Sequence, residues 1–125
     1  MAILTVDDST TIRRIVKRSV DDMGLEVLEA ADGAQALKMI EERAADIQLI
    51  LLDWNMPGMS GLEVLRILKT NPRYKDIVVM MLTSEADQNF VVEALRSGAQ
   101  NYLTKPFDAK MLTLKIQESL SLAQT

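Results

Sequence analysis

Short apolar runs alternate with helical patterns five times along the 125-residue chain. Between and after these runs, apolar residues recur every three or four positions, which is typical of helices with one buried face. The pattern therefore predicts five β/α units, with strands over 3–6, 26–30, 49–52, 77–82 and 101–104 and helices over about 12–23, 34–43, 60–71, 87–97 and 108–122.

Cap residues support several of these helix boundaries. Asp32 and Ser60 stand where the second and third helices need an N-cap, and Glu63 completes capping-box spacing with Ser60. Gly24 and Gly98 follow the first and fourth helices, where a glycine can adopt the left-handed conformation that ends a helix. Local sequence thus predicts both where these helices lie and how they end.

The third and fourth strands are predicted to be buried on both faces. Residues 49–52 and 77–82 are apolar throughout rather than alternating, which is typical of a parallel sheet covered by helices on each side. Five units cannot close an eight-stranded barrel. We therefore expect an α/β fold, a single domain over 1–125 with an open, doubly wound sheet and a site beyond the carboxyl ends of its strands.

Composition excludes several classes of function. The chain has no histidine and no cysteine, so it lacks the usual base of a serine triad, the usual zinc ligands and any thiolate chemistry. The formal net charge is −4 with scattered basic residues, which argues against binding to nucleic acid. No membrane span or export signal is recognisable, and we expect a cytoplasmic location.

Polar residues follow the carboxyl ends of four predicted strands. They are Asp7 and Asp8, Asp53, Thr83, and Lys105. If the first and third strands are neighbours, three carboxylates converge, and two of them about 5 Å apart repel each other by roughly 3 kcal/mol at an effective dielectric of 20. Carboxylate oxygens that need a cation favour Mg²⁺.

The same residues can handle a phosphoryl group. A carboxylate can be the nucleophile of phosphoryl transfer, and Asp53 is the best candidate because it ends a buried strand at the centre of the expected cleft. Thr83 and Lys105 would contact the phosphoryl oxygens. Taken singly, each residue also has a simpler explanation: Asp8 in a helix cap, Asp53 in a turn, and Lys105 on the solvated surface.

The set resembles a known family, the receiver domains of two-component response regulators, and within it the single-domain chemotaxis regulators. The resemblance covers the whole chain. The matching motifs are the acidic pair at 7–8, the stretch Leu-Leu-Asp-Trp-Asn-Met-Pro-Gly-Met-Ser-Gly at 51–61, Leu-Thr-Ser at 82–84, and Tyr102 with Lys-Pro-Phe at 105–107. It implies a flavodoxin-like, five-stranded sheet with strand order 2-1-3-4-5.

The resemblance also implies roles for individual residues. Asp53 would be the phosphoacceptor, and Asp7, Asp8, Asp53 and the backbone carbonyl of Asn55 would bind Mg²⁺. Thr83 and Lys105 would hold the phosphoryl oxygens, with a cis peptide between Lys105 and Pro106. Thr83 and Tyr102 would switch the face built by the fourth helix, fifth strand and fifth helix, and Asn55 and Glu85 would tune the rate of hydrolysis.

The implied partners are a histidine kinase or a small acyl phosphate as donor, and a protein target such as the flagellar motor switch. A phosphatase could also act on it. The resemblance further implies a monomer that is not an enzyme beyond self-phosphorylation and self-dephosphorylation, and that carries no output domain.

Several alternatives stay open at this point. A phosphorelay intermediate or the excised receiver of a larger regulator fits the same residues. A Mg²⁺-dependent phosphohydrolase would need a second acid–base carboxylate where Asn55 stands, and a flavodoxin-like FMN binder would place its phosphate beside repelling carboxylates at Asp7 and Asp8.

Overall fold

A computed structural model describes residues 2–84 and 88–123 of the chain. Strands and helices alternate through the described residues, as predicted. In chain order, the elements are β1 (Ala2–Val6), α1 (Thr10–Asp22), β2 (Glu26–Ala30), α2 (Gly33–Arg43), β3 (Ile47–Asp53), α3 (Gly61–Thr70), β4 (Val78–Thr83), α4 (Gln88–Arg96), β5 (Asn101–Thr104) and α5 (Ala109–Ala123).

The strands form one parallel sheet in the order β2-β1-β3-β4-β5. This confirms the predicted α/β class, the open doubly wound sheet and the strand order. The strand order reverses between β1 and β3. The helices that follow these two neighbouring strands, α1 and α3, therefore lie on opposite faces of the sheet. A crevice at such a reversal is where open α/β sheets bind ligands.

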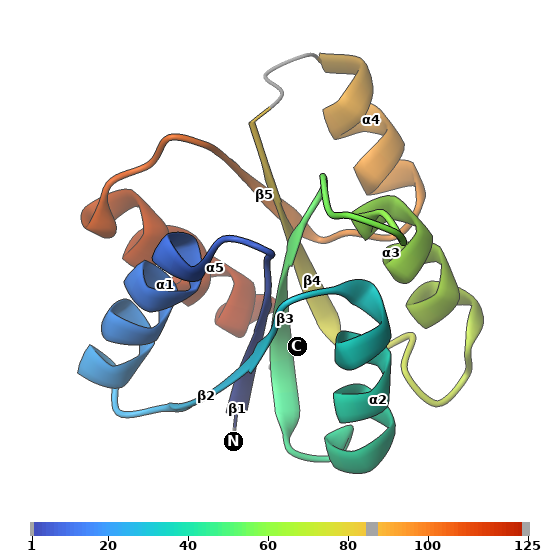
Figure 1. Ribbon diagram of the computed structural model, residues 1–125, viewed down its shortest axis with the longest axis horizontal. Coiled ribbons are helices and arrows are strands. Elements are labelled where there is room, and N and C mark those ends of the chain that lie inside the picture. Colours follow the sequence, from blue (N-terminus) through green and yellow to red (C-terminus); the bar gives the residue numbers. More distant parts are fainter. Residues whose placement is uncertain (1, 85–87, 124–125) are drawn as a thin grey trace.

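Two helical layers cover the sheet, with α1 and α5 on one face and α2, α3 and α4 on the other (Figure 1). Successive residues of the central strands alternate between these layers. On β3, for example, Leu49 and Leu51 pack toward α1 and α5, whereas Ile50 and Leu52 pack toward the other three helices. Burial on both faces explains why these runs are apolar without alternation.

The predicted caps are confirmed by hydrogen bonds. The side chains of Asp32 and Ser60 accept from the backbone N–H of the residue three positions later, and Gly24 and Gly98 have φ of +75° and +109°. Strand β4 begins one residue later than predicted because the N–H of Ile77 bonds to the carbonyl of Tyr74 in the preceding loop. The predicted start of the fourth helix, at 87, lies outside the described residues.

Tight backbone packing ties the end of β3 to the start of α3. The Trp54 N–H donates to the carbonyl of Leu82 at 2.8 Å, and the Gly61 N–H donates to the carbonyl of Trp54 at 3.0 Å. A Cβ at Gly61 would overlap the carbonyl oxygen of Asp53. A glycine at this position therefore allows the chain to fold back directly against the last residue of β3.

None of the helices in the described part of the chain is both long and apolar enough to cross a bilayer.

Replacing Gly61 with alanine should destabilise the protein more than the same change at Gly33. Both glycines are the first residues of their helices. An alanine at 33 would meet only side-chain atoms, a Cγ of Val64 at 2.9 Å and the Cβ of Met59 at 3.1 Å, whereas an alanine at 61 would meet the backbone of Asp53. We expect a loss of about 1–3 kcal/mol at Gly33 and more than about 3 kcal/mol at Gly61, because overpacking against rigid atoms is the costlier case.

Chemical denaturation of both variants measures this difference. Equal losses for Gly61→Ala and Gly33→Ala would contradict a special role for the approach of Gly61 to Asp53.

Candidate functional site

Three elements bring one lysine and two buried carboxylates together. Asp7 follows β1, Asp53 ends β3, and Lys105 follows β5. The Lys105 Nζ lies 3.0 Å from an oxygen of Asp7 and 3.0 Å from an oxygen of Asp53. Asp7 and Asp53 are 0% and 4% exposed. The ammonium thus joins two carboxylates that are distant in sequence, and Lys105 is no ordinary solvated surface lysine.

Asp7 is held by hydrogen bonds at both its backbone and its side chain. Its N–H donates to the carbonyl of Ala30, and its second carboxylate oxygen accepts from the N–H of Ser9 at 2.9 Å. Ser9 caps α1 through a bond from Ile12 to its side chain at 3.2 Å. The stretch that follows β1 therefore combines a helix cap with a buried carboxylate.

Sequence reasoning missed Arg13. From α1, its guanidinium donates to the backbone carbonyl of Asp7 and lies 3.3 Å from the carboxylate of Glu29 on β2. Nothing in the sequence indicates that the side chain of a basic residue in the first turn of a surface helix will point back to the preceding loop.

Asp53 lies in an environment that opposes its charge. The pKa of Asp53 is raised to about 6, mainly by burial; the hydrogen bond and charge of Lys105 act to lower it, and the charges of Asp7 and Asp8 act to raise it. For Lys105, burial works against the charged form, but the hydrogen bonds to Asp53 and Asp7 prevail and raise its pKa. The single positive charge of Lys105 therefore offsets only part of the cost of burying these negative charges together.

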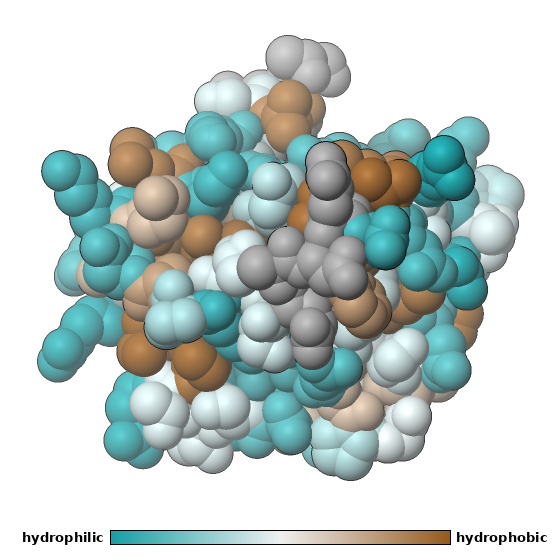
Figure 2. Space-filling model, turned by 90° about the horizontal axis from the view of Figure 1, so that it is seen from above, coloured by the Kyte–Doolittle hydropathy of each residue, from teal (hydrophilic) through white to brown (hydrophobic). Residues whose placement is uncertain are grey.

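A hard divalent cation fits the oxygen donors of this cluster. One carboxylate oxygen each from Asp7, Asp8 and Asp53 lies within 4.8 Å of the others, and Asp8 is exposed while the other two are buried. The donors are all carboxylate oxygens, as Mg²⁺ prefers. Figure 2 looks down on the end of the molecule at which the strands terminate, where polar side chains are mixed with small apolar patches.

The structure also places the other predicted site residues. Thr83 is the last residue of β4, 2% exposed, and its carbonyl accepts from the Lys105 N–H at 2.7 Å. Asn55 is exposed two residues beyond Asp53.

The predicted residues on and after β5 are placed as follows. Tyr102 is 36% exposed, with the Lys115 Nζ 5.6 Å from the centre of its ring. The Lys105–Pro106 peptide is cis, as expected from the resemblance, and Glu85 lies outside the described residues.

An aromatic contact links the segment that follows β3 to α4. Trp54, which follows Asp53, is buried, and its ring packs edge-to-face on Phe90 with centroids 5.3 Å apart. Among the described side chains of α4 only Ala94 is fully buried, one turn beyond Phe90. The Trp54–Phe90 pair therefore joins α4 to the segment that follows β3, and the sequence alone gave no sign of it.

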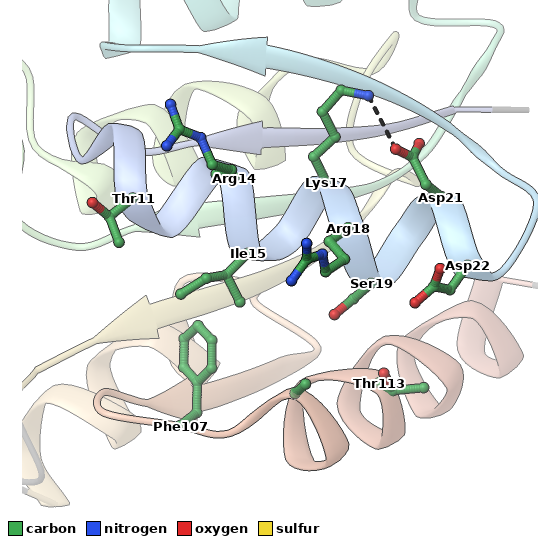
Figure 3. A pocket seen from close by; sticks show the side chains of 11 residues that line it. Thr11, Arg14, Ile15, Lys17, Arg18, Ser19, Asp21, Asp22, Phe107 and Thr113 are labelled. Atoms are coloured by element: carbon green, nitrogen blue, oxygen red, sulfur yellow. Dashed lines mark hydrogen bonds and ion pairs between the residues drawn. The ribbon is translucent and has the colours of Figure 1, made fainter.

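One groove lies apart from the carboxylate cluster. It has a volume of about 740 Å³ and runs between α1 and the start of α5. Ile15 and Phe107 form its apolar part, with Arg14 and Thr113 along its sides (Figure 3). Asp7, Asp8, Asp53 and Lys105 do not line it.

Comparison with known proteins defines the class. Residues 3–117 match the model of the response regulator receiver domain. The chain belongs to this family.

Curated relatives narrow the class further. The chain is 39% identical over 118 residues to chemotaxis protein CheY1 of Helicobacter pylori, covering 94% of each chain. It is 40% identical over 119 residues to chemotaxis protein CheY of Pseudomonas aeruginosa, again covering 94% of each. The solved structure of the chemotaxis response regulator CheY4 of Vibrio cholerae matches with a TM-score of 0.87 at 36% identity, covering 94% of this chain and 97% of that one. The protein is thus a CheY-like receiver domain.

Replacing Asp53 with asparagine should stabilise the protein above pH 6 in the absence of divalent cations. The folded state raises the pKa of Asp53 from 3.8 to about 6. It therefore binds more protons than the unfolded state between these values, and the contribution of this residue to stability falls as the pH rises from about 4 to about 6. We expect Asp53→Asn to gain on the order of 1 kcal/mol at pH 7.5 and the gain to vanish near pH 4.

Thermal unfolding in EDTA across this pH range tests the expectation, with the exposed Asp46→Asn as a control for loss of a surface charge. A gain that is independent of pH, or equal in both variants, would show that Asp53 is not destabilised by its surroundings.

Proposed function

We propose that this protein is a phosphorylation-dependent signalling switch that accepts a phosphoryl group on Asp53. The observation that carries the proposal is the convergence of Asp53, Asp7 and Lys105 from three strand ends, with distances of 3.0 Å from the ammonium to each carboxylate. Membership of the receiver family supports the same role. The donor would be the phosphohistidine of a histidine kinase or a small acyl phosphate.

The proposed chemistry is an in-line displacement by a carboxylate. An oxygen of Asp53 attacks the phosphorus, the bond to the donor breaks, and the donor leaves with the bonding electrons, which gives an acyl phosphate. Asp53 must be ionised to attack, and at neutral pH the carboxylate form prevails because its pKa is about 6. Lys105 already contacts Asp53 and can neutralise an oxygen of the incoming group.

Mg²⁺ is the proposed cofactor, held by Asp7, Asp8 and Asp53 together with the backbone carbonyl of Asn55. When bound, it would supply positive charge for the oxygens of the transferred group. Support comes from the spacing of the three carboxylates within 4.8 Å. Exposure of Asp8 leaves one side of the cluster accessible to solvent, so that water and phosphate oxygens can complete the coordination.

The proposed output is a change in the surface formed by α4, β5 and α5. Thr83 ends β4 beside the site, and Tyr102 on β5 has its side chain at the surface. A phosphoryl group on Asp53 would draw the Thr83 hydroxyl toward it, and Tyr102 would turn inward. Such a switch needs only a few kcal/mol of difference between its two states.

The proposed partners are a histidine kinase, a protein target and a phosphatase. The CheY-like relatives make a target in flagellar motor control the leading proposal, with the cytoplasm as the compartment. Output by protein contact requires no catalysis on external substrates, so we propose a regulator that turns over only its own acyl phosphate, with Asn55 and Glu85 tuning the rate of hydrolysis.

Incubation with acetyl phosphate and Mg²⁺ should add one phosphoryl group to the wild-type protein. Intact-mass spectrometry should show a single labile adduct that EDTA prevents and that Asp53→Asn lacks. Asp46→Asn should be modified like the wild type, because its carboxylate is on the surface and bonded to Arg43. An adduct that persists in Asp53→Asn would place the acceptor elsewhere, and no adduct from either acetyl phosphate or a phosphorylated kinase would refute the proposal.

Replacing Thr83 with alanine should separate phosphorylation from switching. NMR of the wild type with acetyl phosphate and Mg²⁺ should show shifts for the amides of α4, β5 and α5. In Thr83→Ala the adduct should still form, but these shifts should fall by at least about half, because the hydroxyl that follows the phosphoryl group is gone.

Thr11→Ala, an exposed threonine on α1, is the control and should respond like the wild type. Full shifts in Thr83→Ala would remove Thr83 from the switch without affecting the identity of the acceptor.

A further inference from the structure

We propose that Arg13 is a positioning residue for the acidic cluster. It holds the peptide between Asp7 and Asp8 in the orientation that cation binding requires. The guanidinium donates to the Asp7 carbonyl and is paired with Glu29. It thereby joins α1, the segment after β1 and the neighbouring strand β2. This inference rests on the proposed Mg²⁺ site and adds a residue that contributes no ligand to it.

The bonds around Asp7 and Asp8 show why one arginine can matter. The Asp7 side chain is fixed by Ser9 and Lys105, at 2.9 and 3.0 Å. The Ser9 bond closes a turn around Asp8, but neither bond contacts the Asp7 carbonyl, whose direction sets the plane of the following peptide and so the position of the exposed Asp8. The carbonyl at one end of that peptide is the atom that Arg13 contacts. Arg13 therefore restricts Asp8 through the backbone, while the Asp8 carboxylate itself is exposed.

Arg13 is well suited to this role because its own side chain is immobilised. The side chain is only 16% exposed, and the Glu29 carboxylate lies 3.3 Å from its Nε. The planar guanidinium can donate in two directions at once, so pairing with Glu29 leaves another N–H for the Asp7 carbonyl. A hydrogen bond that preorganises a ligand lowers the entropy lost when the cation binds.

The charge of Arg13 and its hydrogen bond should affect Mg²⁺ affinity in opposite directions, so the direction of the change on mutation distinguishes them. A positive charge near a cation site repels the cation, so removing the charge alone would strengthen Mg²⁺ binding. Removing the hydrogen bond would weaken binding, because Asp8 would no longer be held near Asp7 and Asp53. Groups that orient metal ligands typically contribute about 10- to 100-fold to affinity. The positioning effect should therefore exceed the opposing effect of charge.

The experiment is calorimetric titration of the full chain with MgCl₂. We expect Arg13→Ala to bind Mg²⁺ about tenfold more weakly than the wild type. Arg13→Lys, which keeps the charge and one donor, should recover much of the loss. Arg14→Ala is the matched control: Arg14 is exposed on the groove side of α1 (Figure 3) and makes no hydrogen bond or ion pair within 2–84 and 88–123. This variant should bind like the wild type or slightly more tightly.

Unfolding curves without metal verify that each variant is folded, and Arg13→Gln replaces Arg13→Ala if the latter is not. Unchanged or tighter binding in the Arg13 variant, with binding intact in the wild type, overturns the positioning role and leaves the proposed function standing. Absence of Mg²⁺ binding in the wild type overturns both.

Discussion

The site depends on one ammonium shared by two buried carboxylates. At 3.0 Å from Asp7 and from Asp53, the Lys105 Nζ gains roughly 5 kcal/mol of attraction to each at an effective dielectric of 20. Without this charge, two carboxylates would be buried side by side with no positive charge from Lys105 to offset their desolvation. The three residues come from three different strand ends, so the same interaction that neutralises the site also joins β1, β3 and β5 at one edge of the sheet.

The compensation is incomplete, and this explains the chemistry that we propose. A third carboxylate, Asp8, joins the cluster, and the pKa of Asp53 is raised to about 6 despite its bond to Lys105. An excess of negative charge over one ammonium favours the divalent cation that we propose. In the proposed reaction, the raised pKa would make Asp53 a better nucleophile than an ordinary aspartate, while the carboxylate form still prevails at neutral pH.

Rigid and loosely packed parts of the molecule lie next to each other at this edge. Asp53 is followed at once by backbone that bonds to β4 and to the start of α3, and Gly61 packs directly on its carbonyl. By contrast, α4 has only Ala94 fully buried among its described side chains, with Phe90 packed on Trp54. Segments with few buried apolar contacts open most easily. A rigidly held Asp53 beside a helix with few buried side chains suits the switch that we propose.

The sequence by itself determined the elements, the sheet and the list of chemical groups. Hydrophobic periodicity and caps such as Asp32 and Ser60 are local, because they depend on neighbours three or four positions away, and the apolar runs of β3 and β4 reflect burial on both faces. The topological rule for parallel sheets then placed Asp7, Asp53 and Lys105 at one edge.

Only the tertiary structure decided how these groups are bonded. That Lys105 contacts both carboxylates, that Arg13 turns back to the Asp7 carbonyl, and that Trp54 meets Phe90 are contacts between distant segments. Side-chain direction at such contacts depends on the packing of whole layers, which no local pattern records. The pKa of Asp53 follows from the same cause, since burial and neighbouring charge exist only once the strands are assembled.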